Sequence, residues 1–125
     1  MSHLLLVGIG GFIGSVLRYW LSGIAQRWFD NAFPIGTLLV NAMGCFAIGV
    51  FWSLVEYREY FSPETRLFAT FGVLGGFTTF SAFGYETFMA LRDGEYVPAL
   101  LNTSANVLLG LAAVAAGWMA AKALA

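Results

Sequence analysis

The middle of the chain reads Gly72-Val73-Leu74-Gly75-Gly76-Phe77-Thr78-Thr79-Phe80-Ser81-Ala82-Phe83. This stretch lies within an apolar run from Arg66 to Arg92, which is long enough to cross a bilayer as one helix. Its centre is a poor helix former, because Gly75 and Gly76 each cost about 1 kcal/mol relative to alanine in a helix interior. The hydroxyls of Thr78 and Thr79 can also bond to nearby backbone in place of the helical ladder. We therefore predict a helix that is broken near the middle of the membrane.

A broken helix in a membrane has functional consequences. In hydrocarbon, a break is tolerated only where the freed N–H and C=O groups face protein, water or an ion. Discontinuous membrane helices commonly mark ion sites, where unwound carbonyls coordinate cations. The alternative is a glycine-rich packing face, which many membrane helices have. The two threonines and the phenylalanine-rich continuation favour the functional break.

The composition places the whole chain in a membrane. The 125 residues are 59% hydrophobic and 10% charged, whereas soluble domains carry about 25% charged residues. The formal net charge of −1 argues against nucleic acid as a partner. Cys45 is the only cysteine, so no disulfide can form within the chain.

Four apolar segments follow one another with short charged connections between them, at about residues 3–25, 33–55, 67–91 and 97–121. Each has roughly the 17–25 residues that a span requires. We therefore predict an all-α membrane protein in which residues 1–125 form a single domain of four transmembrane helices. The third helix is the broken one, and both termini lie on the same side of the membrane.

The distribution of basic residues does not select one orientation in the membrane. Arg58, Arg66 and Lys122 lie on the side of the termini, whereas Arg27 and Arg92 lie on the other side and Arg18 leans toward it. Orientation normally follows an excess of Lys and Arg in the short cytoplasmic loops. A protein with one orientation and a weak signal is one interpretation. The other is dual topology, in which copies insert both ways and pair antiparallel.

Uncharged polar residues recur inside the predicted spans. Asn41 shares a face of the second span with Thr37, Gly44 and Cys45, and Asn102 and Asn106 lie one turn apart in the fourth. Such amides either join helices by hydrogen bonds or face a polar pathway. Amide and hydroxyl donors, with the positive edges of phenyl rings, bind an anion without a fixed cation. An anion that must also leave needs sites of this moderate strength.

Arg18 lies on a face of small residues in the first span, with Gly11, Gly14, Ser15 and Ser22. This face predicts close contact with another helix. An arginine on it would be costly in lipid, so we expect Arg18 to face the protein interior or a vestibule. A structural arginine with a protein partner and an arginine that attracts ions are both open.

Three motifs resemble those of the Fluc family of fluoride channels, and together they extend over nearly the whole chain. They are Gly10-Gly11-Phe12-Ile13-Gly14-Ser15-Val16-Leu17-Arg18-Tyr19, then Gly36-Thr37-Leu38-Leu39-Val40-Asn41 with Gly44, and then Gly75-Gly76-Phe77-Thr78-Thr79-Phe80-Ser81. The resemblance implies an antiparallel homodimer with two fluoride pores in a bacterial inner membrane. It implies no enzymatic activity, and its partners are fluoride, a second copy of the chain and membrane lipid.

The resemblance also implies roles for particular residues. It places a structural sodium ion at the dimer axis, held by the backbone carbonyls of Gly75 and Thr78. The pore residues that it implies, or that share its polar track, are Asn41, Thr79, Phe80, Ser81, Phe83, Asn102 and Asn106. At positions 102 and 106 family members often have a tyrosine and a serine, so the pore role of these two asparagines is open. Glu86 extends the face of Phe80 and Phe83 by one turn, and Glu86 and Arg18 are candidates for a vestibule.

Two other functions fit a short four-span protein. A small dual-topology multidrug exporter needs an acidic residue in its first span, but the only acidic residue within a span is Glu86 in the third. A structural membrane subunit, held by glycine and asparagine contacts, needs no pathway. Passive anion flux, proton-coupled cation flux or no flux would separate the three.

Overall fold

The computed structural model describes residues 2–29 and 32–124. Within that part, four helical segments are long and apolar enough to cross a membrane. The first, second and fourth are α1 (Ser2–Phe29), α2 (Ile35–Arg58) and α6 (Tyr96–Leu124). The third consists of α3 (Pro63–Arg66), the π-helix η1 (Leu67–Leu74), α4 (Gly75–Phe77) and α5 (Ser81–Arg92). The predicted all-helical membrane fold with an interrupted third span is confirmed.

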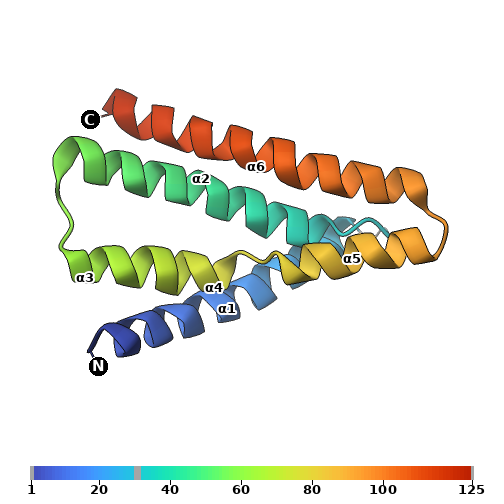
Figure 1. Ribbon diagram of the computed structural model, residues 1–125, viewed down its shortest axis with the longest axis horizontal. Coiled ribbons are helices and arrows are strands. Elements are labelled where there is room, and N and C mark those ends of the chain that lie inside the picture. Colours follow the sequence, from blue (N-terminus) through green and yellow to red (C-terminus); the bar gives the residue numbers. More distant parts are fainter. Residues whose placement is uncertain (1, 30–31, 125) are drawn as a thin grey trace.

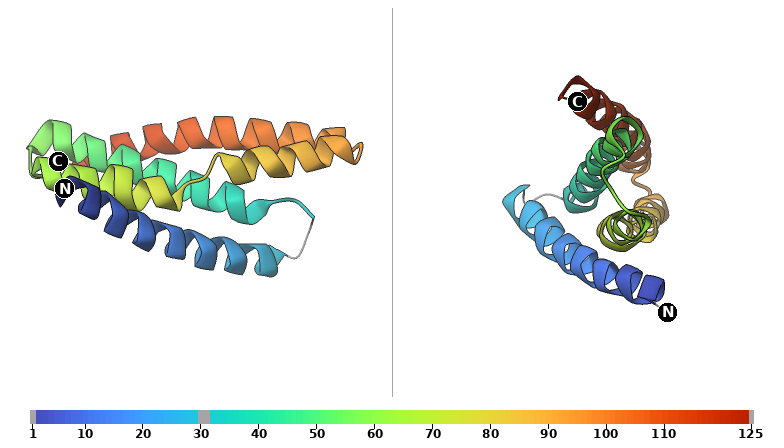
Figure 2. Two further views of the ribbon diagram at one scale, coloured as in Figure 1. Left: turned by 60° about the horizontal axis from the view of Figure 1, so that its bottom comes forward. Right: turned by 90° about the vertical axis from the view of Figure 1, so that its left-hand side faces the viewer.

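Both ends of the described chain lie at the same end of the bundle, together with the α2–α3 connection (Figure 1). The α5–α6 connection lies at the opposite end. The broken third helix changes partners along its length: η1 and α4 pack on α1, whereas α5 packs on α6. Figure 2 shows this arrangement, with α1 beneath the first half of the third helix and α6 along the second. The break therefore lies where the third helix passes from one neighbour to the other.

Glycines allow the backbones of α1 and the third helix to approach closely. Gly14 lies on the small face that predicted this contact, and Gly10 lies outside that face. A Cβ on Gly10 would lie 2.7 Å from the carbonyl oxygen of Phe68 in η1. A Cβ on Gly14 would overlap the carbonyl of Val73. Small residues permit this kind of contact in membranes, where van der Waals packing holds helices together.

The break lies two residues after the glycine pair. Gly75 and Gly76 are helical, and the chain becomes extended at Thr78, with φ −91° and ψ 159°. The break lies within the stretch from Gly72 to Phe83 that predicted it, although the two glycines themselves remain helical. A Cβ on Gly76 would lie only 2.6 Å from the carbonyl oxygen of Gly11 in α1, so close packing explains this glycine.

The two threonine hydroxyls bond to the backbone on either side of the break, as the sequence predicted. The Thr78 hydroxyl donates to the carbonyl of Leu74 over 3.0 Å, and the Thr78 N–H donates to the same oxygen over 3.1 Å. The Thr79 hydroxyl accepts the N–H of Ala82 over 3.1 Å. One threonine therefore ends the first half of the helix, and the other caps the start of α5.

Candidate functional site

A cavity of about 380 Å³ lies beside the break, between α2, the third helix and α6. Seven of the site residues expected from the sequence line it: Asn41, Gly75, Thr78, Thr79, Phe80, Phe83 and Asn106. Ser81 and Asn102 are not among the lining residues. Apart from the thiol of Cys45, no lining side chain is ionisable. The cavity can therefore offer an ion only neutral donors, carbonyl oxygens and ring edges.

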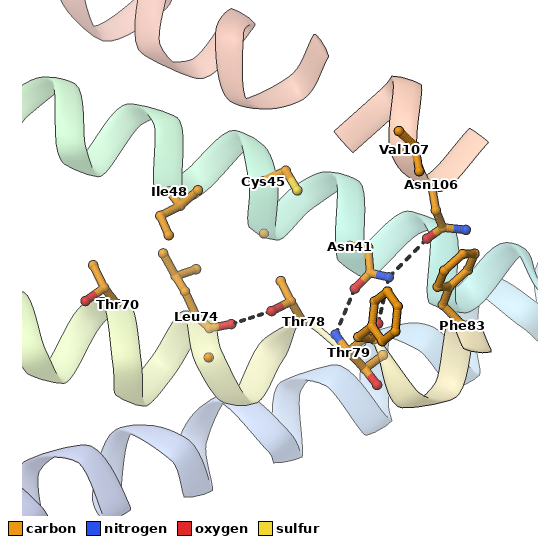
Figure 3. A pocket seen from close by; sticks show the side chains of 13 residues that line it. Asn41, Cys45, Ile48, Thr70, Leu74, Thr78, Thr79, Phe83, Asn106 and Val107 are labelled. Atoms are coloured by element: carbon orange, nitrogen blue, oxygen red, sulfur yellow. Dashed lines mark hydrogen bonds between the residues drawn. The ribbon is translucent and has the colours of Figure 1, made fainter. Parts of the chain in front are cut away.

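The side chain of Asn41 pairs with the peptide of Thr79 at the break (Figure 3). Its Nδ2 donates to the Thr79 carbonyl over 3.0 Å, and its Oδ1 accepts the Thr79 N–H over 2.8 Å. This pairing satisfies both polar groups of a residue that lies outside any helix, which hydrocarbon could not do. The side-chain amide of Asn41 therefore holds the break in its extended conformation.

A chain of hydrogen bonds runs from Asn41 along α6 and back to α5. Asn41 Nδ2 also donates to Asn106 Oδ1 over 3.1 Å. Asn106 Nδ2 donates to both Oδ1 and the carbonyl of Asn102, over 3.0 and 2.9 Å. Asn102 Nδ2 donates to the Thr87 hydroxyl over 2.9 Å, and that hydroxyl donates to the carbonyl of Phe83 over 2.8 Å. Sequence periodicity placed the three asparagines correctly, but it missed Thr87.

Phe80 and Phe83 lie in edge-to-face contact at the start of α5. Their ring centroids are 5.4 Å apart, and the ring planes make an angle of 66°. Phe80 is 81% exposed in the single chain. An aromatic edge carries positive partial charge, so ring edges that border the cavity favour an anion. Ser81 is exposed beside them, with its hydroxyl 3.4 Å from that of Thr79.

A second cavity, of about 510 Å³, lies near the α1–α2 and α5–α6 connections. Glu86 and Asn102 line it. The Thr37 hydroxyl donates to Glu86 Oε2 over 3.0 Å, and Oε1 is buried without a hydrogen-bond partner among the described residues. Asn102 is 2% exposed, and its bonds to Asn106 connect this cavity with the lining of the first.

Arg18 lies apart from both cavities. Its Nε donates to the carbonyl of Gly76 over 3.0 Å, across the contact between α1 and α4. A cation is favourable there, because the carbonyl end of a helix carries partial negative charge. Of the two vestibule candidates, the structure therefore places only Glu86 in a cavity.

Two carbonyls at the break could hold a cation. Among the described residues, hydrogen bonds at the break use the carbonyls of Leu74, Gly76 and Thr79, and leave those of Gly75, Phe77 and Thr78 without a donor. Of these three residues, Gly75 and Thr78 line the first cavity. Hard cations such as sodium prefer oxygen ligands of this kind. No group of three His, Cys, Asp or Glu side chains suited to a metal occurs in residues 2–29 and 32–124.

Comparison with known proteins identifies the family. A family model described as CrcB-like protein, Camphor Resistance (CrcB), matches residues 5–118. "Fluoride-specific ion channel FluC 1" of Methanosarcina acetivorans is 49% identical, over 100% of this chain and 95% of its own. "Fluoride-specific ion channel FluC" of Rhizobium leguminosarum is 48% identical over 100% of both chains. Its namesake of Geobacter sulfurreducens is 46% identical over 99% of this chain and 100% of its own.

These relatives are named as ion channels, which are not enzymes, as expected from the sequence. With four helices able to span a membrane, the chain is a multi-pass membrane protein. The match over almost its entire length shows that it belongs to the CrcB-like family, that of the FluC fluoride-specific ion channels.

Proposed function

We propose that this protein is a fluoride-selective channel through which fluoride leaves the cell passively. The observation that carries the proposal is the uncharged cavity beside the break, in a chain whose full-length relatives are named fluoride-specific ion channels. Neutral donors bind a small anion without holding it so strongly that it cannot leave. The driving force is the membrane potential, which supplies about 2.3 kcal/mol per charge for each 100 mV.

The pathway that we propose uses both cavities. Fluoride would enter or leave by the cavity that Glu86 and Asn102 line, and would pass Asn106 and Asn41 to reach Phe80 and Phe83. The hydrogen-bonded amides between the two cavities support this route. The carboxylate of Glu86 makes its cavity less favourable for an anion, so we assign Glu86 to the vestibule and not to an anion site.

We propose that the functional unit is an antiparallel homodimer with two pores. The nearly equal division of basic residues between the two sides supports dual topology. Phe80 is a pore residue in this proposal, yet its ring is 81% exposed in the single chain. A second copy packed against the break would cover it and would close the cavity. We place the dimer in the cell membrane, which in a bacterium is the inner membrane.

A sodium ion at the dimer axis is part of the proposal. The carbonyls of Gly75 and Thr78 from each copy would hold it, because no residue in the described part of the chain donates a hydrogen bond to these oxygens. The ion would compensate carbonyls that the break leaves free, and would join the two copies at the same point. Its role here is structural.

Fluoride flux through purified protein in liposomes tests the proposed function. We expect electrogenic fluoride efflux, driven by a fluoride gradient and a potassium diffusion potential, with little chloride efflux. Empty liposomes provide the control. Proton-coupled efflux of an organic cation would support a multidrug exporter, and the absence of any flux would support a structural subunit; either result would contradict the channel.

Dual topology predicts that one loop position is accessible from both sides of the membrane. Arg27 is exposed at the end of α1, so Arg27→Cys should react with an impermeant thiol reagent from either face of the cell membrane. The native chain, with only the half-buried Cys45, is the control for background labelling. If labelling of Arg27→Cys were confined to one face, the antiparallel dimer would be excluded.

A further inference from the structure

Both N–H donors of the Asn41 side chain are occupied. One bond goes to the carbonyl of Thr79 and the other to Asn106 Oδ1. An anion in the cavity can therefore accept an N–H from Asn41 only if one of these two bonds opens. Which bond opens determines how tightly the anion binds.

The two bonds differ in what their loss would cost. The bond to Thr79 is half of a pair, since Thr79 N–H returns a bond to Asn41 Oδ1 over 2.8 Å. Opening it would leave a carbonyl at the break without a donor, and unpaired buried backbone groups are costly. The bond to Asn106 is single and 3.1 Å long. It is the bond that an anion can replace at the smaller cost.

The remaining bonds of Asn106 fix which atom it presents to Asn41. Its Nδ2 faces two acceptors of Asn102, the side-chain oxygen and the carbonyl. Asn102 is itself fixed, because it is 2% exposed and donates to the Thr87 hydroxyl. Asn106 can therefore offer Asn41 an oxygen and not an N–H.

We propose that Asn106 Oδ1 is an internal acceptor that competes with fluoride for the N–H of Asn41. This inference rests on the proposed fluoride channel. When fluoride is absent, Asn106 satisfies the Asn41 donor; when fluoride arrives, it must displace the Asn106 oxygen. The competition weakens binding and shortens the time that the ion stays, as conduction requires. Asn102 acts through Asn106 as a positioning residue.

The test removes the competing oxygen. Asn106→Leu keeps the branched shape of the side chain and enlarges it, and Asn106→Ala reduces it, but both leave the Asn41 N–H without this acceptor. Fluoride flux is measured against fluoride concentration in liposomes. We expect the half-saturating concentration to fall about two- to tenfold in both variants, as the loss of one competing hydrogen bond implies. The maximal flux should fall as well, because the ion leaves more slowly.

Agreement between the two variants excludes a simple effect of volume. If the flux of a variant saturates over the measured range of fluoride concentration and that of the native chain does not, this result also shows a lower half-saturating concentration. An unchanged or raised half-saturating concentration in either variant that elutes as the native species on size exclusion would overturn the proposal. If one variant fails to elute in this way, the other decides.

Asn102→Ala tests the positioning role. Alone, it removes the side-chain acceptor of Asn106 Nδ2 and keeps the backbone carbonyl of residue 102. The Asn106 amide should then be held less firmly, so the half-saturating concentration should fall, but by less than in the Asn106 variants. In the Asn106→Leu background, Asn102→Ala should have no further effect on the half-saturating concentration, because Asn102 acts through Asn106. An equal effect of Asn102→Ala in the native and Asn106→Leu backgrounds would contradict the positioning role of Asn102.

The native chain separates this inference from the function on which it rests. If the native protein passes no fluoride, the channel proposal itself fails. If it passes fluoride and the Asn106 variants keep its half-saturating concentration, only the competition fails.

Discussion

Replacing Asn41 with aspartate is expected to reduce fluoride flux by at least about tenfold. The substitution preserves shape but replaces Nδ2, with its two N–H donors, by an oxygen. That oxygen would face two other oxygens, the carbonyl of Thr79 and Oδ1 of Asn106. Each buried polar group left unpaired costs about 1–3 kcal/mol, and a factor of ten corresponds to about 1.4 kcal/mol. The pairing that holds the break would weaken, and the donor for the anion would be lost.

Asn41→Ser is the comparison, because serine retains one donor. Its flux should lie between those of the native chain and Asn41→Asp, measured in the same liposome assay. Size exclusion in detergent establishes that each variant remains folded before its flux is compared. If the aspartate variant had native flux, Asn41 would not be part of the pathway. Its pairing with Thr79 would then not be needed for conduction.

The sequence predicted the existence of the break correctly because the residues that build it act locally. The hydroxyls of Thr78 and Thr79 bond to backbone four residues before and three residues after. Gly75 and Gly76 also have poor helix propensity, but both are helical in the structure. The close approach of Gly76 to Gly11 of α1 depends on a neighbour that helix propensity does not describe. Tertiary packing therefore explains the helical Gly76.

The asparagines of the polar site could be predicted from the sequence, but the directions of their hydrogen bonds could not. Helical spacing placed Asn41 on one face of α2, and Asn102 and Asn106 one turn apart on α6. Which amide donates and which accepts depends on the distances between three helices, so no sequence pattern contains it. The same is true of Thr87, whose role follows from its bond with Asn102. The π-helix η1 also had no sequence signal that we identified.

Gly44→Ala is expected to impair the channel through the methyl group of Thr78. A Cβ at position 44 of α2 would overlap Cγ2 of Thr78, at the residue where the third helix becomes extended. Overpacking of this kind typically costs about 1–3 kcal/mol. Displacement of Thr78 would also move the carbonyl that we assign to sodium. We expect fluoride flux to fall by at least about tenfold.

A second substitution separates this cause from general damage. Thr78→Ser removes only the methyl group and retains a hydroxyl that can donate to the Leu74 carbonyl. The double variant Gly44→Ala, Thr78→Ser should therefore regain much of the flux, while Thr78→Ser alone should remain close to the native chain.

Thermal unfolding in sodium and in potassium adds an independent measurement, because an ion that binds only the folded dimer raises its stability. The native chain and the double variant should be more stable in sodium than in potassium, and Gly44→Ala should lose that difference. If the double variant were as impaired as Gly44→Ala, the contact with the Thr78 methyl would not be the cause. If the native chain were equally stable in both salts, the cation assigned to Gly75 and Thr78 would have to be abandoned, whatever the flux.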